Sequence, residues 1–164
     1  MRTPIWLAAA AATLGAAVLP ACDALNLQEL KPGVSTAAEV RVRMGLPLAE
    51  HRNADGSVTY EYNRQPNGTE CFMMTIGTDQ VLQKIEQVLS EANLARVTAG
   101  MDRDEVRRLL GKAGSVTPYR NSNEEVWDWR VAGTTPNEEA HFHVHFDLAS
   151  GLVKRTSRRV EVKG

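Results

Sequence analysis

Three histidines that alternate along one segment have the residue type and spacing best suited to chemistry. His141, His143 and His145 are separated by apolar residues, so in a β-strand all three would project from one face, with neighbours about 6–7 Å apart. Imidazoles at that spacing can chelate zinc or copper. An equivalent strand in the first half would put Cys71 and Met73 on the matching face, and a mixed site would form if the two strands came close. We favour the alternative, polar side chains on the open face of a sheet, and expect no metal or other cofactor.

Two pairs of aromatic residues are the second set of candidates: Tyr60 and Tyr62, and Trp127 and Trp129. Each pair alternates with an acid, so its two rings share one face of a strand. They are either core residues packed under helices, which we favour, or exposed anchors, and the pattern leaves both open. Exposed aromatic clusters are typical hot spots of protein interfaces. These four residues, together with the three histidines, are therefore the candidate protein-binding residues.

The sequence contains none of the common catalytic patterns. It has no nucleophile elbow, phosphate-binding loop, His-Glu-x-x-His helix or spaced cysteine pair. Ser35, Thr36 and Asp102 are nucleophile or acid types, but each stands at the expected start of a helix, where capping explains it. We therefore expect that the protein is not an enzyme.

The N-terminus has the composition of an export signal. Arg2 is followed by an uncharged apolar run, residues 5–18, that is shorter than a transmembrane helix needs. The run ends in Leu19-Pro20-Ala21-Cys22, which resembles the bacterial lipobox, with proline at an atypical position. This predicts a signal peptide over residues 1–21 and lipid attachment at Cys22, a multiple acylation that would hold the protein on a membrane. Plain cleavage near Ala21 and a membrane anchor helix are the alternatives.

The rest of the chain repeats itself at a constant offset of 67 residues. Leu27–Gly33 falls on Leu94–Gly100 with its apolar positions and glycine in register, and Tyr60-Glu61-Tyr62 falls on Trp127-Asp128-Trp129. Such self-similarity indicates an internal duplication. We place the first repeat at residues 27–92 and the second at residues 93–164.

Each repeat is predicted to contain one short helix followed by three strands. The helices start at capping boxes, Thr36 to Glu39 and Asp102 to Glu105, and stop at Gly45 and Gly111. The strands are marked by alternation and bounded by turns, and their expected ranges are 58–63, 70–76 and 81–89 in the first repeat and 126–131, 140–148 and 152–162 in the second. The fold class is thus α+β, two tandem α-β-β-β repeats, with antiparallel sheet and helices packed on one face. One continuous sheet results if the two halves join edge to edge.

The order of these motifs resembles the SmpA/OmlA family of small outer-membrane lipoproteins, which includes BamE. The resemblance rests on short motifs of the second repeat: Gly100-Met101-Asp102, Val106-Arg107, Leu110-Gly111, Trp127-Asp128-Trp129, Phe146-Asp147 and Gly151-Leu152-Val153. It implies a lipoprotein that supports the β-barrel assembly machinery, although this chain has two units and those proteins have one. The tandem arrangement also looks like the β-lactamase-inhibitor-protein architecture, which implies a binder that inhibits an enzyme.

Charge and cysteine content complete the prediction. The net charge is −1, and cleavage after a leader that carries only Arg2 leaves −2, so nucleic acid is not an expected partner. If Cys22 is acylated, Cys71 has no partner for a disulfide.

We expect a non-catalytic protein-binding or scaffold lipoprotein in outer-membrane assembly or integrity, with envelope proteins, the β-barrel assembly machinery among them, as partners. The alternatives are an enzyme-inhibitor-like binder and a metal-binding lipoprotein. The expected location is the periplasmic face of a membrane, the outer rather than the inner, although Asp23 resembles an inner-membrane retention signal.

Overall fold

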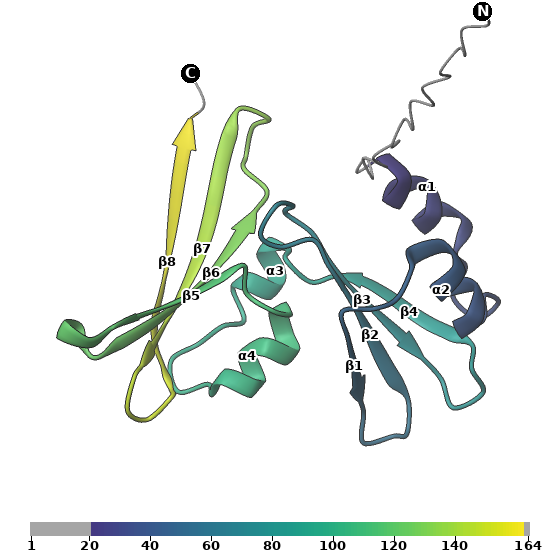
Figure 1. Cartoon of the computed structure of the whole chain (residues 1–164), viewed down its shortest axis with the longest axis horizontal. Helices are drawn as coiled ribbons and strands as arrows, with labels where there is room; N and C mark the ends of the chain where they lie inside the picture. The colour runs from purple at the N-terminus through teal and green to yellow at the C-terminus, as the bar shows by residue number, and fades with distance from the viewer. Residues whose placement is uncertain (1–20, 163–164) are drawn as a thin grey trace, which may run out of the picture.

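The computed structural model describes residues 21–162, which form two four-stranded antiparallel sheets with short helices (Figure 1). The first unit contains α1 (Ala21–Glu29), α2 (Ala37–Met44), β1 (Ala49–Arg52), β2 (Val58–Asn63), β3 (Cys71–Ile76) and β4 (Leu82–Gln87). The second contains α3 (Glu91–Leu94), α4 (Arg103–Leu110), β5 (Ser115–Tyr119), the 3-10 turn η1 (Arg120–Ser122), β6 (Glu124–Val131), β7 (Glu138–Asp147) and β8 (Val153–Val162). In both sheets the strands are ordered as in the sequence.

The predicted fold class is confirmed: the molecule is α+β with two copies of one antiparallel unit. α2 and α4 both begin at a complete capping box. The side chain of Thr36 or Asp102 accepts a hydrogen bond from the backbone N–H of the glutamate three residues later, and the side chain of that glutamate accepts one from the backbone N–H of the cap residue. Both helices end at a glycine with positive φ, +80° at Gly45 and +76° at Gly111. Their ψ angles, −164° and −173°, are extended, so the stop differs from the left-handed C′ form predicted but still requires glycine.

The structure differs from the prediction in the elements of each unit and in the continuity of the sheet. Each unit has an additional short helix before the predicted one, α1 and α3, and an additional strand directly after it, β1 and β5, so the repeat is α-α-β-β-β-β. The two halves also form separate sheets instead of one continuous sheet, with α3 and α4 lying between them in Figure 1.

The two hydrophobic cores explain this arrangement. One core lies between α2 and the first sheet and is built around Val40, Tyr62 and Met74. The other lies between α4 and the second sheet and includes Trp129 and Phe146. Four residues of that second core come from the first unit: Cys71, Met73, Val88 and Leu89. The first sheet is therefore packed on both faces, against α2 and against α4, which corrects the prediction that helices pack on one face. That prediction holds for the second sheet, which has a helix on one face only.

A buried carboxylate joins the units where α4 ends against β2. Glu61 is fully buried and accepts hydrogen bonds from the backbone N–H of Lys112 at 2.8 Å and the side-chain amide of Asn63 at 3.0 Å. His51 Nε2 lies 3.0 Å from its other oxygen, and Arg107 lies 3.7 Å from the same atom. Burial alone would raise the pKa of Glu61, but these hydrogen bonds and the arginine charge outweigh it and hold the pKa below the ordinary value.

The N-terminal helix α1 is tied to the first sheet. Arg64 donates two hydrogen bonds to Asp23, from Nε at 2.6 Å and from a terminal nitrogen at 2.8 Å. The predicted signal peptide lies outside the described residues except for Ala21, and so does the side chain of Cys22. Between residues 21 and 162, no helix has the length and apolar character needed to cross a membrane.

Candidate functional site

The three histidines lie on the uncovered face of the second sheet. β7 alternates so that Phe142, Val144 and Phe146 are buried toward α4, which directs His141, His143 and His145 to the other face. The residues paired with the histidines on the neighbouring strands are polar or charged, except Val126. In the order His141, His143, His145, the partners are Arg130, Asp128 and Val126 on β6 and Arg159, Ser157 and Arg155 on β8. The histidine face, as we call this surface, is thus a polar layer on the side of the sheet opposite to the apolar core.

Asp128 holds the first two histidines. Its carboxylate accepts a hydrogen bond of 2.8 Å from His141 Nδ1, and its second oxygen lies 3.7 Å from His143 Nε2. The rings of His141 and His143 are stacked, with centroids 6.2 Å apart. Burial is the main cause that lowers the pKa of His143, and positive neighbours including Arg159 add to it, while Asp128 opposes the shift. His143 is therefore mainly neutral at neutral pH.

The third histidine belongs to a different network. His145 Nδ1 lies 3.1 Å from Glu124, and its Nε2 lies 2.9 Å from the hydroxyl of Ser157. Lys154 and Arg155 contact the same carboxylate at 3.3 and 3.2 Å. Burial raises the pKa of Glu124, but these hydrogen bonds and positive charges exceed that effect and lower it. In the tautomer that carries its proton on Nδ1, His145 donates to Glu124, and its Nε2 accepts from the Ser157 hydroxyl.

This connectivity, from serine to histidine to carboxylate, is that of an acyl-transfer triad, and no sequence pattern indicates it. Catalysis by such a triad also needs donors aimed at the developing oxyanion. Ser157 stands within β8, and the backbone N–H groups of a strand lie in the plane of the sheet, not toward the face on which its hydroxyl lies. The strands that carry the network therefore supply a hydroxyl and a base but no backbone donor for an oxyanion.

The histidine face is hollowed where β5 and η1 border it. The hollow has a volume of about 500 Å³ and is lined by Tyr119, Val126, His145 and Ser157 among others. Tyr119 is 52% exposed although it is a large aromatic residue. Sequence reasoning did not select Tyr119, and its one signal was an aromatic residue directly after Pro118 in a polar segment.

The predicted aromatic residues lie elsewhere. Tyr60, Tyr62 and Trp129 are buried in the two cores, at 4%, 2% and 0% exposure, which is the alternative that the sequence favoured. Trp127 is half-buried beside Trp129, and its indole N–H donates to Glu125 at 2.8 Å. Of the seven residues proposed for protein binding, the histidines are the set that occupies a face without a covering helix.

The mixed metal site considered from the sequence does not form. Cys71 and Met73 pack in the second core beside Phe142 and Val144, on the side of β7 opposite to the histidines. Within residues 21–162 no three histidine, cysteine or acidic side chains are grouped to hold a metal ion. Burial, and next the nearby Glu61 charge, raise the pKa of the Cys71 thiol, so the residue is a neutral core group.

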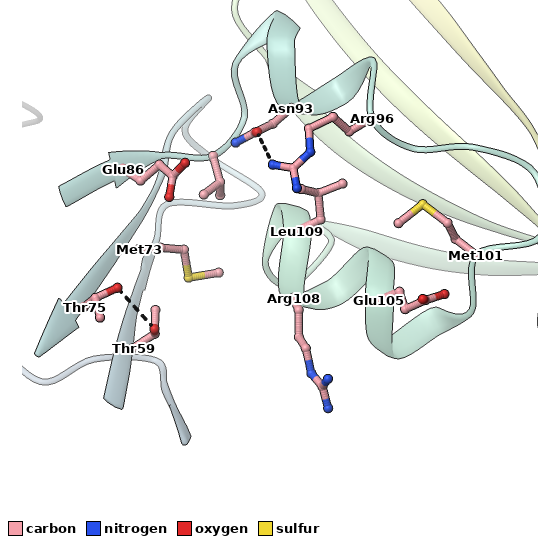
Figure 2. Close-up of a pocket in the computed structure, with 11 residues that line it drawn as sticks. Thr59, Met73, Thr75, Glu86, Asn93, Arg96, Met101, Glu105, Arg108 and Leu109 are labelled. Carbon is pink, nitrogen blue, oxygen red and sulfur yellow. Dashed lines mark hydrogen bonds between the residues drawn. The ribbon is translucent and has the colours of Figure 1, made fainter. Parts of the chain in front are cut away.

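A second depression lies between the units, where α4 leaves part of the first sheet uncovered. Figure 2 shows Met73, Thr59 and Thr75 on the strand side and Arg108 and Leu109 on the helix side. Its volume is about 450 Å³. A neighbouring hollow of about 380 Å³ shares Thr59, Met73 and Arg108 with it, so the two are continuous. We call the combined depression the seam groove.

Comparison with known proteins gives two similar structures and no family. No protein-family model matches the chain, and no curated protein matches it, so the resemblance to SmpA/OmlA proteins gains no support. The chain is similar to a candidate beta-lactamase inhibitor protein from Streptococcus mutans, at 13% identity and a TM-score of 0.34, covering 85% of this chain and 96% of that one. It is also similar to a DUF4309 family protein, YjgB, from Bacillus subtilis, at 15% identity and a TM-score of 0.31, covering 83% and 84%. At these TM-scores the two likenesses assign neither a family nor a function.

Proposed function

We propose that this protein is an exported bacterial lipoprotein that binds other envelope proteins without catalysing a reaction. The observation that carries the proposal is the histidine face, a hollowed surface that no described element of the chain covers. Its polar network surrounds the exposed ring of Tyr119 and the side chain of Val126. An aromatic anchor within a polar rim is the composition found at protein interfaces.

The N-terminal residues support the membrane part of the proposal. The sequence ends its apolar leader at Cys22, and α1 starts at Ala21 without an intervening linker. Asp23, directly after the predicted acylated residue, is held by Arg64. Acylation at Cys22 would therefore hold the first unit close to the bilayer, on the periplasmic side of the outer membrane in this proposal.

Membrane attachment and partner binding need separate tests. Labelled palmitate should be incorporated into the full chain and lost in Cys22→Ala, and incorporation in that variant would refute lipid attachment. For binding, the full chain and a Tyr119→Ala variant are purified from membranes and their partners are identified by mass spectrometry.

The identity of the partners decides between functions. Recovery of β-barrel assembly components by the full chain, reduced in Tyr119→Ala, supports a scaffold role. Recovery of a soluble hydrolase instead would mean that the protein is an inhibitor-like binder, and equal recovery by both proteins would exclude the histidine face as the binding surface. Val116→Ala is a matched control because Val116 is equally exposed on β5, at 52%, but does not line the hollow.

A further inference from the structure

The seam groove is bordered by an excess of arginines. Arg96, just after α3, and Arg108 on α4 line the larger hollow, and Arg52, the last residue of β1, lines the smaller one. All three side chains are exposed. None of them forms an ion pair with a carboxylate among residues 21–162; Arg96 bonds only to the Asn93 side chain, at 3.1 Å.

The acidic residues at the groove already have partners. Glu86 pairs with Lys84 at 2.7 Å, and Glu105 accepts from the backbone N–H of Asp102 at 2.8 Å in the capping box of α4. The backbone hydrogen bond leaves the negative charge of Glu105 in place, but the charge of Glu86 is already paired with Lys84. Two carboxylates therefore stand against three arginines, and the groove keeps a net positive charge toward whatever enters it.

Four apolar side chains, which we call the floor of the groove, line its larger hollow: Met73, Val88, Met101 and Leu109. Methionine side chains adapt their shape to different apolar surfaces, while the hydroxyls of Thr59 and Thr75 bond to each other at 3.4 Å. A ligand that fits this surface has apolar groups for the floor and several separated negative charges for the rim.

We propose that the seam groove binds an acidic, partly apolar peptide segment of a partner protein. Two continuous hollows with arginines from three separate segments of the chain suit an extended chain better than a single small anion. This site is distinct from the histidine face: its ligand is a strand-like or loop segment, and its loss would leave binding at Tyr119 unaffected.

The test uses a fluorescently labelled peptide of alternating glutamate and leucine, with anisotropy as the readout, on the chain without its leader. The glutamate peptide should bind, and a peptide with glutamine in place of glutamate should bind at least about ten-fold more weakly, because the arginine contacts are charge-assisted. Raising the salt concentration should weaken the glutamate complex. Arg96→Gln and Arg108→Gln should each reduce affinity several-fold and more in combination.

Arg120→Gln is the matched control, since Arg120 is exposed but lies beyond the groove, at η1. The proposal is overturned if the double variant binds as tightly as the unmodified chain, if Arg120→Gln weakens binding equally, or if the glutamine peptide binds as well. Complete displacement of the peptide by inorganic phosphate at low millimolar concentration would show a small-anion site instead and would equally overturn it. All variants change exposed side chains, so the fold is retained and a circular dichroism spectrum verifies it.

Discussion

The Glu61 carboxylate accepts a 2.8 Å hydrogen bond from the backbone N–H of Lys112 and thereby ties β2 of the first unit to the residue after α4 in the second. Fifty-one residues separate the two partners, so this contact depends on the relative placement of the units. In the duplicated motif, Asp128 occupies the position of Glu61 but lies on the histidine face, where it binds His141 instead. One repeated acid therefore fastens the units together, and the other organises a surface.

Removal of the Glu61 carboxylate is expected to destabilise the whole molecule. Glu61→Ala should lower the free energy of unfolding by about 3–5 kcal/mol, because it leaves the Lys112 N–H and the Arg107 charge without their buried partner. Glu61→Gln should cost less, about 1–2 kcal/mol, since its oxygen still accepts from Lys112. Urea unfolding of both variants measures the effect.

Glu50→Gln is the control for Glu61, since it breaks an exposed ion pair with Arg41 and should change stability by less than about 1 kcal/mol. The pH dependence gives a further check. Because the folded pKa of Glu61 is below its ordinary value of 4.5, its stabilisation is present above that value and lost as pH falls through the folded pKa. Glu61→Gln should flatten this acid-side decrease, and an unchanged slope would contradict the assignment.

Much of each unit follows from local sequence. The capping boxes at Thr36 and Asp102 and the glycine stops at Gly45 and Gly111 are decided within a few residues, and alternation marks the long strands. β1 and β5 were missed because they are short edge strands: β1 spans four residues, and β5 is exposed throughout and contains Pro118.

The sequence of β3 carries a signal of the packing between the units, although that signal is not an alternation. Cys71-Phe72-Met73-Met74 is apolar at every position, and all four residues are buried. Such a run is typical of a strand covered on both faces, as β3 is. The Ser157–His145–Glu124 network could not be predicted, since its three members come from three strands and their meeting depends on register, which includes a shift next to His145.

The two glycines that end the helices should respond differently to alanine. Both have positive φ, so Gly45→Ala and Gly111→Ala each carry a backbone strain of about 1–3 kcal/mol. A Cβ at Gly45 meets nothing within 4 Å, whereas one at Gly111 would lie 2.6 Å from Cys71 Sγ. Gly111→Ala should therefore cost about 1–3 kcal/mol more than Gly45→Ala. Equal unfolding midpoints for the two variants would contradict the close contact between Gly111, at the end of α4, and Cys71 on β3.

His143 should make stability depend on pH near neutrality. Its folded pKa lies below the ordinary value of 6.5, so the unfolded chain binds the proton more readily. Stability from this residue is then full above 6.5 and decreases as pH falls below it, until the folded pKa is passed. His143→Gln should remove that decrease, which urea midpoints measured on both sides of 6.5 will reveal. A variant whose midpoints fall with pH as steeply as those of the unmodified chain would refute the prediction.

Ser157 should be unreactive despite its hydrogen bond to His145 Nε2. The histidine orients the hydroxyl, but Lys154 and Arg155 share the Glu124 carboxylate, and no strand N–H points at the face where an oxyanion would form. A fluorophosphonate probe should leave the protein unlabelled, and Ser157→Ala should hydrolyse p-nitrophenyl acetate at the rate of the unmodified chain. Stoichiometric labelling of Ser157, abolished in His145→Gln, would instead establish an acyl-transfer site and would replace the non-catalytic function proposed for the histidine face.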